Sequence, residues 1–593
     1  MFLHLQPLSR GAIVLPALAT AFAWCIGLRL GGGWYSASWA HRLQTEAFFR
    51  GTLALQPVPY GQMADWAWGH GSQQVWGLGV PLLRFPLEAL AKLVGGIGFP
   101  DRVTLLLAFT AVAAVFWRAF AGVQPWERVC LLLMTAFTPA FVTLCRTRLS
   151  VYEEASAYAC LCALLLAGLL LRLAAVPTRR TFCWLCAFAG VAPFFRPTLV
   201  FTSLVTLGMA LPLASRHGQR VPEQLAGLGL FALGPLALML TAQLRFGSPF
   251  ETGQLLNVSY IPLDQFAKVF GYPFWYEPWR NAAAELFSSL FLATGWNGVD
   301  WYQSGIHPWQ SETLRFREFY FSTFTPAVFV VLVLSWTAVA AVFLARRRVD
   351  DPRIGAAALW SASVFVILCG FYLWAPSMTS RYAVDFAPSI AIGIAGGLLL
   401  LFRSVDSRAL SALAAFAGGS WVLHDVAYAA ISPTHRTQQL VTAAVVRERL
   451  PRPVLEGPPL PDAYRCGENP ERFGVKFNGS GWAYLGDCTV DAGSMFFLAG
   501  PDCIRVDVAS PAGEQRLGPA EIAAVRAKIG LAELEQVRAE ATAGGTRLTF
   551  CLPAGHGPVD SRIEVVYLGW MDPRLVRRGV KPLRLLEVAE VER

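Results

Sequence analysis

Long apolar runs, broken by short polar clusters, dominate the chain up to about residue 431. A helix needs about 20 mainly apolar residues to cross a bilayer. Eleven segments meet this requirement, and they cover residues 11–30, 102–121, 128–145, 155–175, 181–195, 198–214, 224–243, 323–345, 354–374, 384–402 and 409–430. The pattern predicts an all-α polytopic membrane domain over residues 1–431. We expect the first helix to be retained, because no A-x-A-like cleavage site follows it.

The segment 78–98 breaks this pattern, although it is long enough to span. It contains two prolines and three charged side chains, namely Pro81, Pro86, Arg84, Glu88 and Lys92. Exposing such charges to lipid on a spanning helix costs several kcal/mol. We therefore predict that this segment is an interfacial or re-entrant helix.

Clusters of arginine orient the predicted helices. Short loops rich in arginine stay on the inner face of a membrane. With the N-terminus inside and residues 78–98 not crossing, all such loops fall inside, and their arginines are Arg118, Arg128, Arg172, Arg179, Arg180, Arg216, Arg220, Arg346, Arg347, Arg348, Arg353, Arg403 and Arg408. The long loops 31–101 and 244–322, and everything after residue 431, then lie outside.

Composition supports a membrane protein. The 593 residues are 55% hydrophobic and 15% charged, against about 25% charged in a typical soluble domain. The formal charge of +9 would suit nucleic acid, but the arginines are spread between apolar segments. They are explained as topology signals, so we expect no nucleic-acid partner.

Residues 432–593 change to the pattern of a soluble domain. Short runs rich in β-branched and aromatic residues predict strands at 473–485, 494–499, 503–509, 546–552 and 561–570. A helical period after Gly518-Pro519 predicts one helix over 518–534. We therefore expect a small, mainly-β domain of sandwich type outside the membrane.

Four of the 12 cysteines lie in this second domain: Cys466, Cys488, Cys503 and Cys551. An even number of cysteines in an external domain suggests two disulfides. Three pairings are possible, and the sequence does not choose among them.

The two long outside loops are rich in tryptophan. Trp66, Trp68 and Trp76 lie in the first of them. Flat rings stack on the apolar faces of sugars, which makes these residues candidates for sugar or lipid docking. The alternative is an aromatic belt at the membrane interface. Loops of this length in a compact fold are usually functional.

Several short motifs follow one another through the membrane domain. They are a Gly- and aromatic-rich stretch from Asp65 to Pro86, an acidic stretch from Thr147 to Ala155, Phe195-Arg-Pro-Thr198 and Ser380-Arg-Tyr382. Taken in this order, they resemble the bacterial GT-C superfamily of polytopic membrane glycosyltransferases. Members of that superfamily take sugars from polyprenyl-phosphate carriers at the outer face of the inner membrane. The resemblance covers residues 1–430 and implies a GT-C-like fold with a periplasmic C-terminal domain.

The resemblance implies a carboxylate that accepts the proton of the incoming hydroxyl group. Asp65 is the first candidate, followed by Glu153, Glu154 and Glu46. Each of these residues has a simpler explanation. Asp65 could be an ordinary loop or capping residue, and Glu153 and Glu154 could complement the dipole at the start of a helix. Glu46 could belong to the polar face of an amphipathic helix. The family's usual acidic residue directly after the first span is missing, because residues 34–41 contain no carboxylate.

The donor phosphate requires cationic partners, and the candidates are Arg381, Arg196, Arg146 and Arg148. The planar guanidinium donates two hydrogen bonds to a phosphate, although arginines at this depth also reach toward lipid headgroups. His41, Glu46, Asp65 and His70 share one loop without a recognisable ligand spacing. We therefore expect no metal and no cofactor.

The sequence thus favours an inverting glycosyltransferase that uses a polyprenyl-phosphate-linked sugar at the periplasmic face. Its other partners would be membrane lipids and a glycan, lipid or protein acceptor from the envelope. The alternative is a non-enzymatic protein, either a transporter of lipid-linked sugars or a scaffold for envelope assembly. A transporter should show internal repeats or ionisable residues at mid-membrane.

Overall fold

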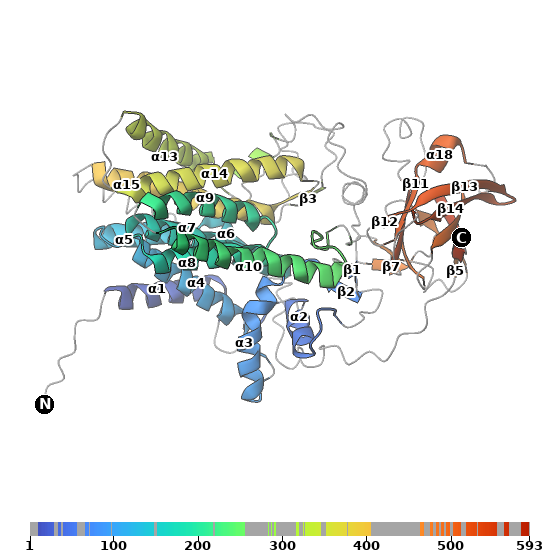
Figure 1. The fold of residues 1–593 in the computed structure, drawn as a ribbon, viewed down its shortest axis with the longest axis horizontal. Coiled ribbons are helices and arrows are strands. Elements are labelled where there is room, and N and C mark those ends of the chain that lie inside the picture. Colours follow the sequence, from blue (N-terminus) through green and yellow to red (C-terminus); the bar gives the residue numbers. More distant parts are fainter. Residues whose placement is uncertain are drawn as a thin grey trace.

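The protein has a helical bundle and a separate β domain (Figure 1). The computed structural model describes residues 10–28, 34–36, 40–55, 66–69, 71–96, 98–146, 151–216, 220–254, 256, 283, 286–287, 290–291, 316–318, 324, 326–345, 351–375, 377–404, 463–467, 475–477, 482–484, 488–490, 494–498, 502–510, 517–529, 532–553, 562–567 and 583–591. In Figure 1 the β domain lies beyond the end of the bundle that carries β1, β2 and α2.

The bundle is made of helices that follow the apolar runs of the sequence. They are α1 (Arg10–Cys25), α4 (Asp101–Ala119), α5 (Pro125–Ala136), α6 (Pro139–Arg146), α7 (Val151–Ala175), α8 (Arg179–Val191) with η2 (Ala192–Phe194), α9 (Leu199–Arg216), α10 (Val221–Phe246), α13 (Pro326–Leu344), α14 (Pro352–Trp374) and α15 (Ser380–Ser404). In the described part of the chain, six of these helices are long and apolar enough to cross a membrane: α4, α7, α10, α13, α14 and α15. The shorter apolar helices are α1 and α9.

These helices agree with the predicted multi-pass membrane domain, but the count of eleven spans stays a prediction. The last predicted span, 409–430, lies outside the described residues. The prediction of a single helix over 128–145 is wrong, because α5 ends at Ala136 and α6 begins at Pro139. Proline lacks the N–H that would continue the helix, and it disfavours helical geometry in the residue before it.

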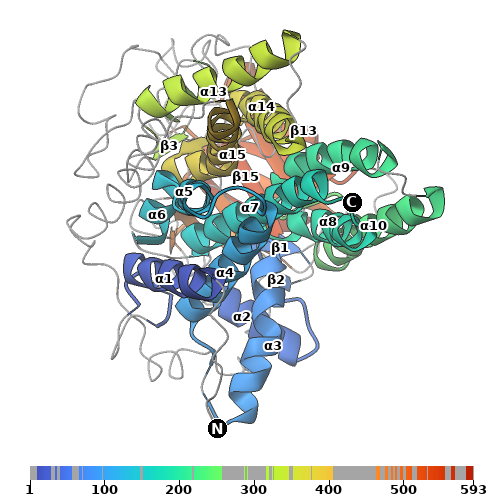
Figure 2. The same ribbon diagram turned by 90° about the vertical axis from the view of Figure 1, so that its left-hand side faces the viewer.

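The helix α7 lies in the middle of the bundle, with its neighbours on all sides (Figure 2). Its residues are buried along almost the whole length, from Val151 to Ala174. It packs against α4, α15, α9, α14 and α8. A helix that is apolar all round is suited to such a central position, and its first turn is therefore surrounded by several other elements.

The segment predicted to stay out of the bilayer forms α3 (Gly79–Leu93), which runs across the direction of the bundle helices (Figure 1). Two of its charged side chains face inward and several of its apolar side chains face outward, the reverse of a helix in a soluble protein. Arg84 and Glu88 are buried, whereas Leu90 and Leu93 are exposed. Next to it lie α2 (Ala40–Phe49) and the hairpin of β1 (Trp66–Gly69) and β2 (Gly71–Gln74).

Several of the arginines used as topology signals meet at the opposite end of the bundle. Arg353, in the first turn of α14, donates hydrogen bonds of 2.8 Å to the carbonyl oxygens of Ala119 and Ala121. Arg403, near the end of α15, donates to the Gly122 carbonyl at 3.3 Å. The arginine-rich ends of α4, α14 and α15 therefore lie together, as a common inner face requires.

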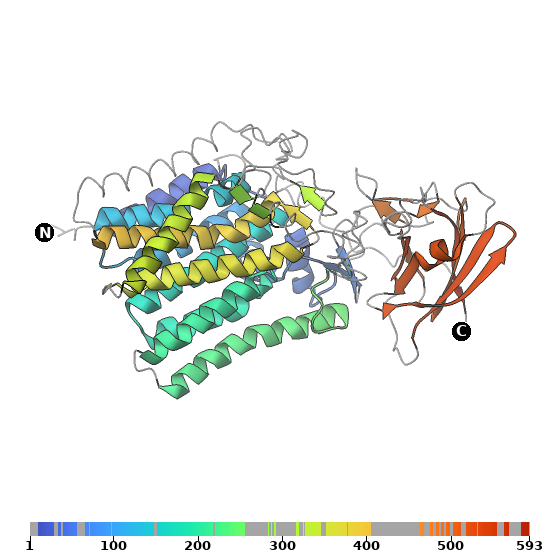
Figure 3. The same cartoon turned by 90° about the horizontal axis from the view of Figure 1, so that it is seen from above.

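The β domain consists of two six-stranded sheets that share one apolar core (Figure 3). The first has the order β13 (Glu535–Thr542), β14 (Gly545–Cys551), β10 (Cys503–Ala509), β16 (Leu583–Val591) and β5 (Ala463–Arg465), with β8 (Thr489–Val490) also on β16. The second has the order β12 (Ala532–Glu533), β11 (Val525–Ile529), β15 (Arg562–Tyr567), β9 (Ser494–Phe497), β6 (Val475–Phe477) and β7 (Trp482–Tyr484). A short parallel pair, β3 (Phe316–Glu318) and β4 (Ser377–Thr379), belongs to the bundle's loop-bearing end.

The prediction of a helix over 518–534 is wrong beyond its first turn. Only α18 (Pro519–Ala523) is helical, and β11 follows at once. Val525, Ala527, Lys528 and Ile529 are all buried, and β11 pairs with both β12 and β15. Pairing inside a sheet here outweighs the helical propensity of the alanine-rich sequence.

Two disulfides hold the β domain. Cys466 is bonded to Cys488, and Cys503 is bonded to Cys551. The second bridge joins residues that face each other on neighbouring strands, because Cys503 is the register partner of Cys551. This is one of the three pairings that the sequence leaves open.

Candidate functional site

A cluster of buried charges lies at the loop-bearing end of the bundle. It is formed by five side chains from four helices, here called the charge cluster: Arg42, Arg84, Glu88, Asp101 and Glu154. Arg42 contacts Glu88 at 2.7 Å and Asp101 at 3.0 Å, and Arg84 lies 3.6 Å from Glu154. All five are at most 6% exposed, so each charge depends on the others for its stability.

The charge cluster also binds the chain that follows the first helix. The backbone N–H of Ser36 donates to the Asp101 carboxylate at 2.8 Å, and the Phe99 N–H donates to Glu88 at 3.0 Å. Thus Asp101 of α4 places a carboxylate beside residues 34–36, a stretch that has no acidic side chain of its own. Asp101 and Glu154 are both paired with arginine inside the charge cluster, and their role in this cluster is structural.

Glu46 does not join the charge cluster. Its carboxylate lies 2.7 Å from the Lys92 ammonium, at the partly exposed contact between α2 and α3. The Lys92 ammonium also lies over the Phe49 ring, 4.1 Å from its centroid. Glu46 therefore links two helices at the surface, away from the buried groups.

Arg381 and Glu153 meet beside the first turn of α7. The Arg381 guanidinium lies 4.0 Å from the Glu153 carboxylate and 4.2 Å from the centroid of the Tyr152 ring. The Tyr152 ring packs edge-on against Trp76 at 5.3 Å. Aromatic faces stabilise a nearby cation, so this arrangement holds a positive charge beside the first turn of α7.

Arg196 lies against the same part of α7. It follows η2 and reaches Asp385 of α15, with 3.2 Å between Nε and Oδ2. Its Nη1 donates to the Ser156 hydroxyl at 2.5 Å, and its guanidinium lies 5.1 Å from the centroid of the Tyr382 ring. Arg196 and Arg381 thus both contact residues in the first two turns of α7, namely Ser156, Glu153 and Tyr152. We call Arg196, Arg381, Glu153, Tyr152 and Tyr382 the arginine site.

His41 connects the two groups of charges. Its ring packs edge-on against Trp76 at 6.3 Å, and it is buried close to Arg84. Burial first, and then the positive charge of Arg84, lower the pKa of His41 to about 3. His41 is therefore a neutral ring at physiological pH.

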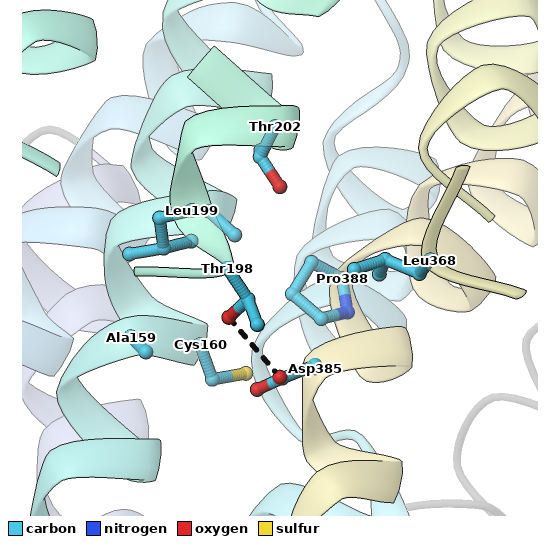
Figure 4. Close-up of a pocket in the computed structure, with 9 residues that line it drawn as sticks. Ala159, Cys160, Thr198, Leu199, Thr202, Leu368, Asp385 and Pro388 are labelled. Carbon is cyan, nitrogen blue, oxygen red and sulfur yellow. Dashed lines mark hydrogen bonds between the residues drawn. The ribbon is translucent and has the colours of Figure 1, made fainter. Parts of the chain in front are cut away.

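A small cavity lies deeper in the bundle, between α7, α9, α14 and α15. Its lining includes Asp385, Thr198, Thr202, Cys160 and Pro388 (Figure 4). Its volume is about 10 Å³, which is roughly the space that one water molecule needs. The cavity borders Asp385, the partner of Arg196, and is too small for a sugar.

Several predicted site residues lie outside the described residues or have side chains that the structure does not describe. Asp65, His70 and Arg148 belong to the first group, and Arg146, Trp66 and Trp68 belong to the second. The hairpin next to Asp65 is nevertheless anchored. Arg245, near the end of α10, donates from Nε to the Gln73 side chain at 3.2 Å and from Nη2 to the Gln74 carbonyl.

Within the described ranges, no three His, Cys, Asp or Glu side chains are grouped so that they could hold a metal ion. The chemistry that this arrangement offers is cationic. Two arginines, fixed by carboxylates and aromatic rings, can stabilise the negative charge of a phosphate.

Sequence reasoning missed Asp385 and the α3–α4 part of the charge cluster. A signal for Asp385 was present, since it is the only carboxylate within the predicted span 384–402. An ionisable residue inside a span is by default a candidate for function. In the sequence, the charges of α3 indicate only that this segment does not cross the membrane.

Comparison with known proteins adds two distant likenesses. No protein-family model matches the sequence, and no curated protein matches it. Among solved structures, the archaeal oligosaccharyltransferase AglB from Archaeoglobus fulgidus, in complex with an inhibitory peptide and a dolichol-phosphate, is 14% identical with a TM-score of 0.35 over 72% of this chain and 56% of that one. The arabinosyltransferase EmbB from Mycobacterium smegmatis is 12% identical with a TM-score of 0.36 over 98% of this chain and 64% of that one.

The chain therefore spans less than two thirds of the length of either protein, at 56% and 64%. Both are named as transferases of sugars. At this identity and TM-score, function has to be argued from the site itself.

Proposed function

We propose that this membrane protein is an inverting glycosyltransferase, which transfers a sugar from a polyprenyl-phosphate donor to an envelope acceptor at the periplasmic face. The observation that carries the proposal is the arginine site. Arg196 lies in the turn between η2 and α9 and Arg381 lies in α15, yet both lie beside the beginning of α7 at the loop-bearing end. Two fixed cations at that depth fit a phosphate headgroup, and the apolar helices around them fit its prenyl chain.

In this proposal Arg196 and Arg381 stabilise the charge that develops on the leaving phosphate. Trp76 and Tyr152, which pack on each other beside Arg381, offer rings on which a sugar can stack. Asp65 remains the proposed proton acceptor, because Glu154 is paired inside the charge cluster and Glu46 is paired with Lys92. Glu153 orients Arg381.

The test is a transfer assay on the full chain in lipid nanodiscs, with a panel of sugar-linked undecaprenyl phosphates and extracted envelope glycans or lipids. Arg381→Gln should lower kcat/KM by roughly 10²-fold, as the loss of one charge-stabilising donor does. Asp65→Asn should lower kcat by about 10²–10⁴-fold and leave donor binding intact. Arg220→Gln is the matched control, because Arg220 is an exposed arginine directly before α10, far along the chain from Arg245 near the other end of that helix.

One observation favours the alternative of a non-enzymatic assembly factor. The carboxylate nearest to the missing family acid is Asp101, which binds Ser36 and two arginines and is not available for catalysis. Binding of undecaprenyl phosphate without transfer from any donor, in wild type and in Asp65→Asn alike, would establish that alternative.

A further inference from the structure

Asp385 receives one ion pair and two hydrogen bonds on a single carboxylate oxygen. Arg196 Nε lies 3.2 Å from Oδ2, and the Thr198 hydroxyl donates to the same oxygen at 3.2 Å (Figure 4). The Tyr372 hydroxyl donates to it as well. The donors come from the η2–α9 turn and from α14, so one oxygen of α15 joins three segments of the bundle.

This bonding fixes the direction of Arg196. Its Nε is held by Asp385, its Nη1 by Ser156, and one side of the guanidinium is covered by the Tyr382 ring. The side chain is still 15% exposed, against 6% for Asp385. Asp385 is therefore the more buried member of the pair, and Arg196 is the member that solvent or a ligand can still reach.

The environment gives Asp385 few other partners. It lines the one-water cavity together with Thr198, Thr202 and Pro388, and the remaining lining is apolar apart from Cys160. A carboxylate buried in such surroundings is kept only where it has a paired charge. Its charge partner among the described residues is Arg196.

We infer that Asp385, with Tyr372 and Thr198, is a positioning residue that holds Arg196 in the orientation needed to bind a lipid-linked phosphate. This inference rests on the proposed function, in which Asp385 has no role so far. Asp385 touches neither the phosphate nor the sugar; it acts by removing rotational freedom from the Arg196 side chain before the ligand arrives.

The test measures binding of undecaprenyl phosphate to the full chain in detergent micelles, with undecaprenol as the ligand that lacks the phosphate. Asp385→Asn keeps the shape of the side chain and removes its charge. Affinity for undecaprenyl phosphate should fall about 10–100-fold, the usual effect of losing a hydrogen bond to a charged group. Affinity for undecaprenol should not change. Asp385→Glu, which restores the charge, should recover part of the loss, and Tyr372→Phe should lose less than Asp385→Asn.

Asp351→Asn is the matched control. Asp351 is also a buried aspartate paired with arginine, Arg353, but at the inner end of α14. It should lower thermal stability as Asp385→Asn does and leave binding unchanged. The inference fails if wild type and Asp385→Asn bind undecaprenyl phosphate with equal affinity, or if Asp351→Asn loses as much affinity as Asp385→Asn. Either result leaves the proposed function standing. A wild-type chain that binds undecaprenyl phosphate no better than undecaprenol overturns the phosphate site and the proposed function with it.

Discussion

At the scale of single residues, His41 makes the fold sensitive to acid. Its pKa is about 3 in the folded chain and about 6.5 in an unfolded one. Between these values the unfolded state binds a proton that the folded state does not, so stability falls as the pH falls through this window. The slope from one such group is about 1.4 kcal/mol per pH unit.

His41→Gln should remove this part of the acid sensitivity. We expect the free energy of unfolding to depend less steeply on pH between about 6.5 and 4 in the variant than in wild type, measured by denaturant or thermal unfolding in detergent. Lys92→Met is a suitable comparison, because Lys92 is a partly exposed side chain of α3. Identical slopes for His41→Gln and wild type would show that His41 is protonated in the folded protein.

Residue by residue, the sequence draws attention to Arg196 and Arg381 but not to Asp385, the carboxylate with which Arg196 pairs. Arg196 and Arg381 stand out beside recognisable motifs, and the structure places both next to α7. Asp385 and Asp101 do not stand out, because a buried ion pair depends on contacts between helices far apart in the chain. No local pattern records that Arg196 and Asp385, 3.2 Å apart in space, will meet.

At the scale of elements, the β1–β2 hairpin depends on α10 for its position. Arg245 is buried and donates to both Gln73 and Gln74. Arg245→Leu removes these donors, and hydrogen bonds to charged groups contribute about 1.5–3 kcal/mol each. We expect hydrogen exchange of the backbone amides in residues 66–74 to accelerate by at least about tenfold.

The control for this experiment is Arg220→Leu, at the exposed start of the same helix. It should leave exchange in the hairpin unchanged. If Arg245→Leu also leaves it unchanged, the hairpin is held by the apolar contacts of Ala67 and Val75 with Ala242 and Phe246, and the arginine is dispensable there.

Helices and strands were predictable where a single local pattern, such as apolar length or a run of β-branched residues, determines the secondary structure. The long helices α7, α10 and α14 follow from apolar length, and β10 follows from its run of β-branched residues. The strand β11 was not predicted, since its alanine-rich sequence is compatible with a helix and its pairing partner β15 lies more than 30 residues further along the chain. Likewise, a hydropathy run does not reveal the break that Pro139 makes between α5 and α6.

At the scale of the whole molecule, the arrangement predicts which end of the bundle faces which compartment. Arg353 and Arg403 lie at one end, and both sites of buried charge lie at the other. A reporter fused after Arg180 should therefore be cytoplasmic, and one fused after residue 431 should be periplasmic. The four cysteines of the β domain should resist alkylation unless reduced. A periplasmic signal from the fusion after Arg180 would reverse the assignment.

The charge cluster also imposes an order on biogenesis. Arg42 and Arg84 are synthesised before Asp101, and Glu154 follows roughly ten seconds after Arg42 at ordinary translation rates. Until α7 has been made, Arg84 lacks its contact with Glu154, whereas Arg42, Arg84, Glu88 and Asp101 can already pair with one another. We therefore expect α3 to reach its final position only after α7 has been made. Chains that stop before residue 154 would leave Arg84 without Glu154, and α3 would lack this ion pair to the central helix of the bundle.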